Sequence, residues 1–152
     1  MKKRDILVFI LILGLDQITK IMAFANDSLN VEIIKDFFYL GQVKNTGAAW
    51  GVLEGNMLIF YVVTLIAVVY IFRLYKKSSD KPRYLQLATL LLLAGAIGNF
   101  IDRIMLGYVR DFLDFYIFGY DFPLFNIADS ALVIGVITLI FYVVKHPHED
   151  LI

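Results

Sequence analysis

The sequence predicts an all-α membrane protein with four transmembrane helices and a small strand-containing region outside the lipid. Two observations carry this prediction. The 152-residue chain is 60% hydrophobic with a mean hydropathy of +0.74, whereas soluble domains are close to half apolar. Its apolar residues form long continuous runs, unlike the alternating pattern of a membrane β-barrel. We expect one integral membrane domain over residues 1–152.

The first predicted span covers about residues 6–25. A basic start followed by an uncharged run is also typical of a signal peptide, and Ala23-Phe24-Ala25 supplies a cleavage pattern. Asp16 and Lys20 interrupt the segment at a spacing of four, which places both on one face of a helix. The apolar character continues beyond them, and twenty residues make about 30 Å of helix, enough to cross a bilayer. We therefore favour a span over a cleaved signal peptide.

Three further apolar runs predict the remaining spans, at about residues 57–72, 85–101 and 127–144. Between the first two spans, Val31–Ile34 and Phe37–Val43 carry β-branched and aromatic residues, which indicates short strands. Residues 107–126 are interpreted as a second polar, aromatic-rich loop. The small residues from Gly47 to Gly51 would let the backbone approach another helix or an extended ligand.

Basic residues flank the predicted spans asymmetrically. They concentrate at the N-terminus, between the second and third spans and after the fourth: Lys2, Lys3, Arg4, Arg73, Lys76, Lys77, Lys81, Arg83 and Lys145. The opposite loops hold Lys35, Lys44 and Arg110 among many acids. Because cytoplasmic loops carry the excess of Lys and Arg, both termini are expected in the cytoplasm.

The overall composition excludes several classes of function. The formal net charge is zero, so charge gives no reason to expect a nucleic-acid partner. Cysteine is absent, which removes disulfides, thiol nucleophiles and cysteine-ligated metals. His146 and His148 lie beside Glu149 and Asp150 in a C-terminal tail, where a stray metal site is the alternative to plain solvation. We expect a solvated tail, no bound metal and no cofactor.

The unusual polar residues of the predicted spans gather at one depth. At 1.5 Å per residue, Asp16 and Lys20 lie about 15 and 21 Å along the first span, toward its outer end. The full set belongs to the outer half of the bilayer or the loops above it: Asp16, Lys20, Asn45, Asn99, Asp102, Asp111, Asn126 and Asp129. The inner halves of the spans are almost purely apolar. A proton or ion pathway needs polar groups through the full thickness, so this pattern indicates chemistry on something lodged in the outer leaflet.

An unpaired carboxylate near lipid is unfavourable, so aspartates at this depth indicate a functional site. Two carboxyls at one site cannot both ionise easily, so one holds a proton near neutral pH. The ionised one can take a proton from water while the other donates to a carbonyl oxygen, as in aspartic proteases. Acids also come together to bind ions, so a proton-coupled transporter or channel subunit is an alternative function. A structural membrane subunit is a second alternative. The sequence has no serine-nucleophile motif of Gly-x-Ser-x-Gly type and no His-Glu-x-x-His zinc motif.

Four stretches together carry a resemblance: Asp16–Lys20 (DQITK), Asn45–Trp50 (NTGAAW), Gly95–Arg103 (GAIGNFIDR) and Phe125–Ser130 (FNIADS). In this order the chain resembles lipoprotein signal peptidase, also called signal peptidase II. The resemblance implies a bacterial aspartyl endopeptidase of the cytoplasmic (inner) membrane, with its active site toward the outer leaflet. It implies removal of the signal peptide from prolipoproteins, with the cut just before a diacylglyceryl-modified cysteine. Membrane lipids and globomycin-type peptide inhibitors are the other partners that it implies.

The resemblance also implies the site residues. The catalytic pair falls on Asp111 and Asp129. The residues that bind substrate or support this pair would be Asp16, Lys20, Asn45, Gly47, Asn99, Asp102, Arg103, Asn126 and Ala128. The chain departs from the family pattern at Arg110, since two valines usually precede the aspartate at position 111. A cation there is expected to lower the pKa of Asp111, or else to point to solvent or lipid headgroups.

The residues themselves agree with several of these roles. The amides of Asn45, Asn99 and Asn126 can hold a peptide backbone or orient carboxylates. Asp102 and Arg103 can form an ion network that ties the third span to the loop above it. Asp102 is also the reserve candidate for a catalytic acid.

Plainer interpretations stand beside these roles. Asp16 and Lys20 would form a neutralising helix pair, and Asp114 and Asp121 would be solvated loop acids. Ala128 keeps room next to Asp129. The small-xxx-small spacings Gly95/Asn99, Ala94/Gly98 and Ala131/Gly135 favour close helix packing. An aromatic belt at the membrane interface accounts for Phe37, Phe38, Tyr39, Tyr116 and Tyr120.

Overall fold

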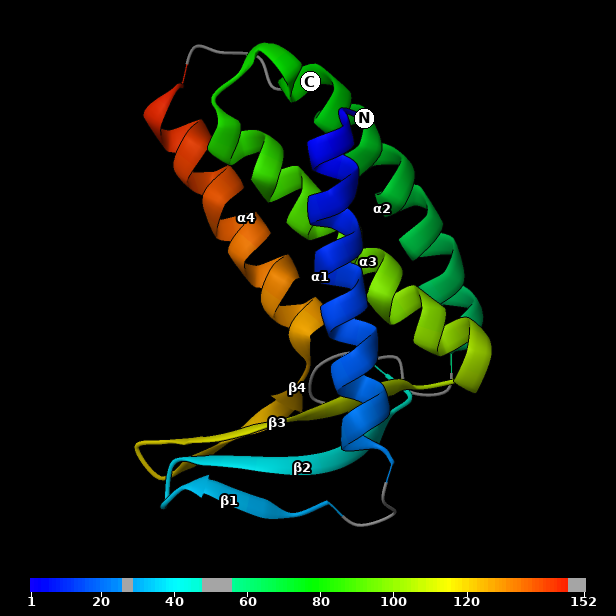
Figure 1. The fold of residues 1–152 in the computed structure, drawn as a ribbon, viewed down its shortest axis with the longest axis vertical. Helices are drawn as coiled ribbons and strands as arrows, with labels where there is room; N and C mark the ends of the chain where they lie inside the picture. The colour runs from blue at the N-terminus through cyan, green and yellow to red at the C-terminus, as the bar shows by residue number, and fades with distance from the viewer. Residues whose placement is uncertain (26–28, 48–55, 148–152) are drawn as a thin grey trace.

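The computed structural model describes residues 1–25, 29–47 and 56–147. In this part of the chain, four helices are long and apolar enough to cross a membrane. They are α1 (Lys3–Ala23), α2 (Met57–Lys77), α3 (Arg83–Leu106) and α4 (Ile127–Lys145). The start of α1 and the end of α4 lie at the same end of the bundle (Figure 1).

Three of the helices differ in length from the predicted spans. The helix α2 continues to Lys77, and α3 continues to Leu106, so Asp102 and Arg103 lie inside α3 rather than at its end. The reason is that hydropathy marks only the apolar part of a helix, whereas charged residues with good helix propensity extend it. The helix α1 ends at Ala23, two residues before the predicted limit.

The helix α3 is the centre of the bundle and contacts each of the other three helices. Its face toward α2 packs Leu92 and Leu93 against Ile71 in an apolar core. The outward faces of the other helices are apolar as well and leave Leu11, Ile66 and other large side chains exposed. Such extensive apolar exposure is unfavourable in water and suits a lipid environment.

Two glycines of α3 allow close helix contacts, as the small-residue spacing predicts. A Cβ atom on Gly95 would lie 2.5 Å from the carbonyl oxygen of Ala128 in α4. A Cβ atom on Gly98 would lie 2.6 Å from Oδ2 of Asp16 in α1. Because no real Cβ tolerates such distances, α1 and α4 can approach α3 this closely only where α3 has no side chain.

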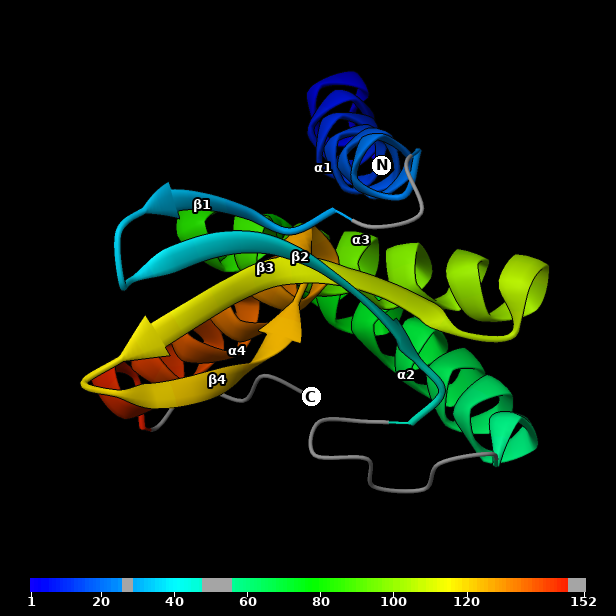
Figure 2. The ribbon, with the colours of Figure 1, turned by 90° about the horizontal axis from the view of Figure 1, so that it is seen from below.

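A four-stranded antiparallel sheet lies across one end of the bundle (Figure 1, Figure 2). Its strands, in the order β1-β2-β3-β4, are β1 (Val31–Ile34), β2 (Phe38–Asn45), β3 (Val109–Ile117) and β4 (Tyr120–Phe125). The first two strands confirm the predicted short strands. The fold is mostly helical, and the all-α class is too narrow a description because the sheet joins two segments far apart in sequence.

The interpretation of residues 107–126 as a loop is wrong, since this segment forms β3 and β4. Asp111, Asp114 and Asp121 interrupt the apolar alternation that would have signalled strands. The pairing partner of β3 is β2, where Phe38 stacks on Phe115 at 4.5 Å between ring centroids. The turn between β3 and β4 has positive φ at Phe118 and Gly119, as a two-residue hairpin of type I′ requires.

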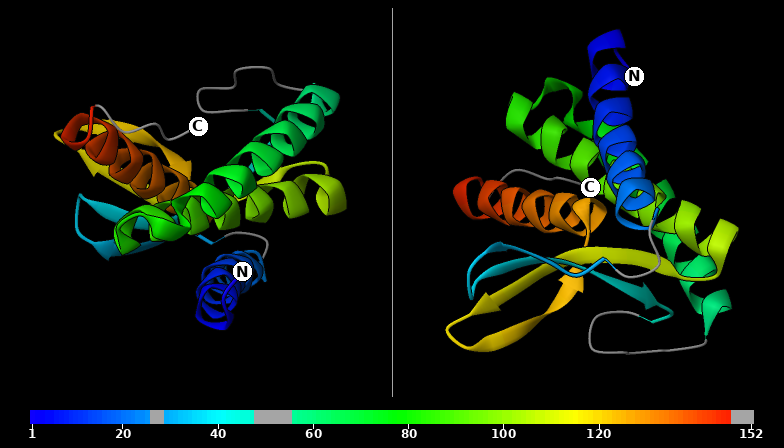
Figure 3. Two further views of the ribbon diagram at one scale, coloured as in Figure 1. Left: turned by 90° about the horizontal axis from the view of Figure 1, so that it is seen from above. Right: turned by 60° about the horizontal axis from the view of Figure 1, so that its bottom comes forward.

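The sheet is attached to one end of the helices (Figure 3). Gly107, with φ of +77°, ends α3 in the left-handed conformation and turns the chain into β3. The strand β4 runs through Asn126 directly into α4. The side chain of Gln42 in β2 donates to the carbonyl of Ala23 at the end of α1. Three of the four helices are therefore joined to the sheet beside the polar cluster.

A buried acid that the sequence interpretation did not use lies at the opposite end of the bundle. The carboxylate of Asp5 in α1 accepts a hydrogen bond from the Tyr75 hydroxyl of α2 at 2.6 Å. Its other oxygen lies 2.6 Å from Nη1 of Arg83 in α3. Arg83 neutralises the buried Asp5 and Tyr75 donates a hydrogen bond to it, so these contacts join three helices at the end away from the sheet.

Candidate active site

The start of α4 determines where Asp129 lies. Asn126 is the N-cap of this helix, and its side-chain oxygen accepts from the backbone N–H of Asp129 at 2.9 Å. In return, Oδ2 of Asp129 accepts from the backbone N–H of Asn126 at 3.1 Å. This reciprocal capping box satisfies two backbone donors and fixes the orientation of both side chains.

The second oxygen of Asp129 is held by α3. Its Oδ1 accepts from the amide of Asn99 at 2.7 Å. The amide oxygen of Asn99 accepts in turn from Nζ of Lys20 at 2.8 Å and from the amide of Asn126 at 3.2 Å. Asn99 therefore connects α1, α3 and the start of α4, and its orientation is determined by these partners.

Asp111 reaches the same place from the sheet. It lies on β3 with 2% of its surface exposed. Its Oδ2 accepts from the amide of Asn45 on β2 at 2.8 Å, and its Oδ1 accepts from the amide of Asn126 at 2.6 Å. Asn126 thus donates to Asp111 and caps the helix turn that carries Asp129, so a single side chain contacts both acids. All four carboxylate oxygens of Asp111 and Asp129 accept an N–H group.

The surroundings of Asp111 disfavour its ionised form. Burial, and then repulsion from the nearby Asp129, raise the pKa of Asp111 to about 7. Hydrogen bonds from Asn45 and Asn126 and the positive charge of Lys20 oppose this shift. A carboxyl with this pKa is present in both protonated and ionised forms near neutral pH, as a residue that exchanges protons during catalysis needs to be.

Asp16 and Lys20 do more than neutralise each other along one helix. Their charged groups lie 3.0 Å apart, and both side chains are buried. Oδ1 of Asp16 accepts from the backbone N–H of Ala128 at 2.9 Å, in the first turn of α4. Lys20 contacts Asn99 of α3, as described above. The pair therefore joins α1 to the two helices that hold Asn99 and Asp129.

The predicted ion network between Asp102 and Arg103 is wrong in its partners. The fully buried Asp102 accepts from the side chain of Arg110, with Nη2 at 2.7 Å and Nε at 3.1 Å. Of the two expectations for Arg110, the one that its guanidinium points to solvent or lipid headgroups is wrong, because its side chain is only 12% exposed and contacts Asp102 and Gln17. A lowered pKa of Asp111 stays a prediction. Arg103 instead donates to the carbonyl of Gly47 at 3.0 Å and lies 4.4 Å from the ring of Phe60. Because Asp102 and Arg103 are adjacent on a helix, their side chains point in different directions and contact different partners.

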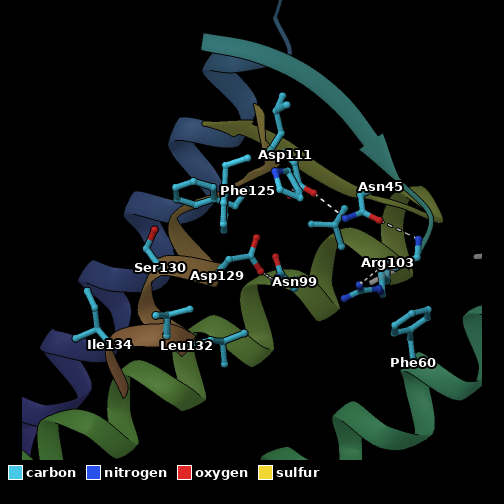
Figure 4. A pocket seen from close by; sticks show the side chains of 16 residues that line it. Asn45, Phe60, Asn99, Arg103, Asp111, Phe125, Asp129, Ser130, Leu132 and Ile134 are labelled. Carbon is cyan, nitrogen blue, oxygen red and sulfur yellow. Dashed lines mark hydrogen bonds between the residues drawn. The ribbon is translucent and has the colours of Figure 1, made fainter. Parts of the chain in front are cut away.

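The two aspartates face one cavity of about 760 Å³ between the sheet and the helices α2, α3 and α4. Figure 4 shows Asp111, Asp129 and Asn99 along one wall, with Phe60 of α2 across the cavity. The polar residues that line it are Asn45, Asn99, Arg103, Asp111, Asp129 and Ser130. Most of the remaining lining is apolar: Phe60, Val109, Phe122, Pro123, Leu124, Phe125, Leu132, Val133 and Ile134, with Gly47. This combination suits a ligand with a polar centre and apolar chains.

The structure brings all the sequence-predicted site residues together, in two layers. Asn45, Gly47, Asn99, Arg103, Asp111 and Asp129 line the cavity, whereas Asp16, Lys20, Asp102, Asn126 and Ala128 support them from behind. Beyond Gly47, the small-residue stretch that was predicted to approach another helix or an extended ligand lies outside the described residues, and so does the tail from His148.

Sequence reasoning missed two contributors to the site. The amide of Gln17 donates to Asp16 at 2.9 Å and to the carbonyl of Gly98 at 3.1 Å. Its position inside the DQITK stretch was the available signal. Phe60 faces the cavity from an apolar span, where nothing in the sequence distinguishes a lining residue from a lipid-facing one.

Comparison with known proteins gives a consistent result. The sequence model of the family described as signal peptidase (SPase) II matches residues 8–145. A lipoprotein signal peptidase of Staphylococcus haemolyticus is 43% identical over 147 residues, which covers 95% of this chain and 93% of the relative. One from Staphylococcus aureus strain JH9 is 43% identical over 143 residues, with 93% and 88% covered.

Two solved structures of bacterial membrane enzymes, determined by the in meso method, share the fold. One superimposes with a TM-score of 0.89 at 41% identity and covers 97% of this chain and 92% of the other. The second has a TM-score of 0.85 at 41% identity, with 95% of each chain covered. Sequence and fold thus agree over nearly the whole chain, and the protein belongs to the signal peptidase II family.

Proposed function

We propose that this protein is an aspartyl endopeptidase that removes the signal peptide from bacterial prolipoproteins, with Asp111 and Asp129 as its catalytic pair. The activity follows from membership of the family. The assignment of the pair rests on one observation: two carboxylates, oriented by asparagine amides, face one largely apolar cavity. The protein is a multi-pass bacterial membrane protein.

The mechanism is acid–base hydrolysis without a covalent intermediate. Asp111 and Asp129 share one proton, because like charges at one site oppose double ionisation. The ionised carboxyl takes a proton from a water molecule, whose oxygen attacks the carbonyl carbon of the scissile peptide bond. The protonated carboxyl donates to the carbonyl oxygen and gives the neutral tetrahedral intermediate. When the C–N bond breaks, the protonated carboxyl gives its proton to the amine that leaves, and a hydroxyl of the intermediate gives its proton to the other carboxylate, which restores the singly protonated pair.

The apolar walls account for a lipid-modified substrate. The acyl chains of a diacylglyceryl-cysteine lie against Phe60, Leu132 and Ile134, while the peptide backbone meets the polar wall near Arg103. The cut falls just before the modified cysteine. Membrane lipids occupy the same apolar walls when substrate is absent, and globomycin-type peptide inhibitors compete for the cavity.

The orientation in the membrane follows from charge. The helix ends away from the sheet carry the excess of basic residues, so they face the cytoplasm together with both termini. The sheet and the catalytic pair then lie at the outer leaflet. Residues 1–152 act as one integral membrane domain in this arrangement.

The structure fits a proton-coupled transporter less well than a protease. Between the cluster around Asp5 and the cluster around Asp129, the described core contacts among helices are apolar, with Ile71, Leu92 and Leu93 at their centre. A proton or ion pathway would need polar groups at this depth.

A gel-shift cleavage assay tests the proposal. Purified protein in detergent is mixed with a prolipoprotein that already carries its diacylglyceryl group. We expect cleavage by the wild type, loss of cleavage in Asp111→Asn and in Asp129→Asn, and retained cleavage in the control Asp114→Asn, whose side chain lies outside the cavity lining. Cleavage by either of the first two variants would overturn the catalytic pair, and Asp102→Asn would then be the next variant to measure.

A further inference from the structure

Arg110 directly precedes Asp111 on β3, and its side chain is buried rather than solvated. Successive residues of a strand point to opposite faces. Asp111 faces the cavity, so Arg110 faces away from it, toward α1 and α3. Only 12% of the Arg110 side chain is exposed. A buried cation at this position needs buried partners, and the partners are what give it a role.

Every partner of the Arg110 guanidinium among the described residues lies on α1 or α3. Its Nη2 and Nε donate to the two oxygens of Asp102 at 2.7 and 3.1 Å, which is the bidentate geometry that arginine favours. Its Nη2 also donates to Oε1 of Gln17 at 3.1 Å. The backbone N–H of Arg110 donates to the same carboxylate at 3.0 Å. The strand is therefore attached to α3 one residue before Asp111.

Charge counting shows what the guanidinium contributes. The cluster holds the carboxylates of Asp16 and Asp102 and the cations Lys20 and Arg110, so it is neutral. Because Nη2 of Arg110 pairs with Oδ1 of Asp102 at 2.7 Å, Nζ of Lys20 stays 3.6 Å from Oδ2 of that carboxylate. Lys20 instead lies 3.0 Å from Asp16 and donates to Asn99 at 2.8 Å. Without Arg110, the ammonium group of Lys20 would be the only cation of this cluster beside the two buried carboxylates of Asp16 and Asp102.

Other charged groups face this cluster without replacing Arg110. Arg103 on α3 is directed to Gly47, and Lys44 on β2 lies 5.4 Å from the ring of Tyr108. The remaining charged groups are the catalytic acids themselves, Asp111 on β3 and Asp129 on α4. The link from the cluster to these acids runs through the hydrogen bond from Lys20 to Asn99 and from Asn99 to Asp129.

We propose that Arg110 is a positioning residue of the active site: its guanidinium neutralises Asp102, and this keeps Lys20 on Asp16 and Asn99, so that Asn99 holds the carboxyl of Asp129. The proposal rests on the proposed function in treating Asp111 and Asp129 as the catalytic pair. It assigns to a residue that does not line the cavity a role in the electrostatics of the site.

Removal of this charge has a defined consequence. In Arg110→Gln the cluster carries one net negative charge, and Lys20 moves toward Asp102. The added negative charge lies on Asp102, whose carboxylate accepts from the backbone N–H of Arg110, the residue next to Asp111. A unit charge this close in the chain raises the pKa of a carboxyl by about one pH unit. The pH–rate profile therefore moves to higher pH by about that amount, and kcat falls about tenfold, as expected for losing a charge-assisted hydrogen bond that orients a reacting group. KM changes little, because Arg110 does not line the cavity.

The experiment compares wild type, Arg110→Gln and Arg110→Lys in lipid bicelles, with kcat and KM for diacylglyceryl prolipoprotein measured from pH 5 to 9. The control is Lys44→Gln, which removes an exposed cation from the neighbouring strand. We expect the upward shift and the loss of kcat in Arg110→Gln only. Arg110→Lys keeps the wild-type profile because it keeps the charge. A wild-type pH profile in Arg110→Gln, or a shifted profile in Arg110→Lys, overturns the proposal.

A second measurement separates this proposal from the activity. The carboxyl carbon of Asp111 is followed by ¹³C NMR and identified by its absence in Asp111→Asn. Its titration midpoint is expected to rise in Arg110→Gln and to stay unchanged in Arg110→Lys and Lys44→Gln, whether or not the preparation cleaves substrate. If the Asp111 midpoint is unchanged in Arg110→Gln, the electrostatic role is rejected even if cleavage is lost. If the midpoint rises in Arg110→Gln but the wild type does not cleave prolipoprotein, only the proposed function is rejected.

Discussion

Replacement of Asp111 by Asn exchanges a buried carboxyl for a neutral amide of nearly the same shape. The pKa of this carboxyl is raised from 3.8 to about 7 by burial and by repulsion from Asp129. Ionised Asp111 is therefore unfavourable in the folded protein and favourable in the unfolded chain. The folded state keeps the proton between these two pH values while the unfolded state releases it, so the free energy of unfolding falls as pH rises from about 4 to about 7.

The size of this effect follows from the difference of about three pH units. Each unit corresponds to about 1.4 kcal/mol, so ionisation of Asp111 destabilises the folded wild type by at most about 4 kcal/mol above pH 7. Asp111→Asn removes this dependence. The amide of the variant places one N–H toward a donor, either Asn45 or Asn126, and this lowers stability by a similar amount at every pH. The difference between the two proteins therefore isolates the ionisation of Asp111.

Thermal unfolding in detergent, measured from pH 4 to 8, tests this reasoning. We expect the unfolding temperature of Asp111→Asn, relative to wild type, to rise by several degrees between pH 4 and pH 8. Burial and the neighbouring Asp121 also raise the pKa of Asp114, but that side chain is partly exposed, so Asp114→Asn should give a smaller rise. A constant difference between wild type and Asp111→Asn across this range would refute the electrostatic account of the pair.

Three further predictions concern packing, orientation and metal. Gly98→Ala places a Cβ 2.6 Å from the Asp16 carboxylate and should lower both the unfolding temperature and cleavage, whereas Gly14→Ala, with no neighbour within 4 Å, should leave both unchanged. Asn99→Leu removes the amide that donates to Asp129 and should lower kcat about 100-fold, with correct folding checked by circular dichroism. EDTA should leave the cleavage rate unchanged, because the proposed mechanism assigns activation of water to the carboxyls of Asp111 and Asp129; a loss that Mg²⁺ or Zn²⁺ restores would contradict this.

The helices were predictable because each is a local property of the chain. A run of about twenty apolar residues is long enough to cross a bilayer whatever the rest of the protein does. The family was recognisable for a similar reason, since the stretches around Asp16, Asn45, Asn99 and Asp129 are continuous in sequence. The capping box of Asn126 and Asp129 is also local, because its two residues are three positions apart.

The strands β3 and β4 were not predictable in the same way. Their stability comes from pairing with β2, and β2 precedes them by two complete helices. Alternation of apolar and polar residues identifies a strand only when one face meets a core and the other meets water. Here Asp111 points to a buried site, so a polar residue stands where an apolar one would have signalled the strand.

From the sequence one could predict four apolar helices long enough to cross a membrane, the family that the chain resembles, and the polar residues that lie together beside one cavity. The partners of those residues came only from the folded chain: Arg110 donates to Asp102 and makes no direct contact with Asp111, and Asp16 accepts from the backbone of Ala128, 112 residues away. The physical reason is that spacing along a helix or strand assigns each side chain to a face of its own element. Which faces of different elements meet depends on how the apolar surfaces and small residues of all the helices pack together, and no single stretch of sequence contains that information.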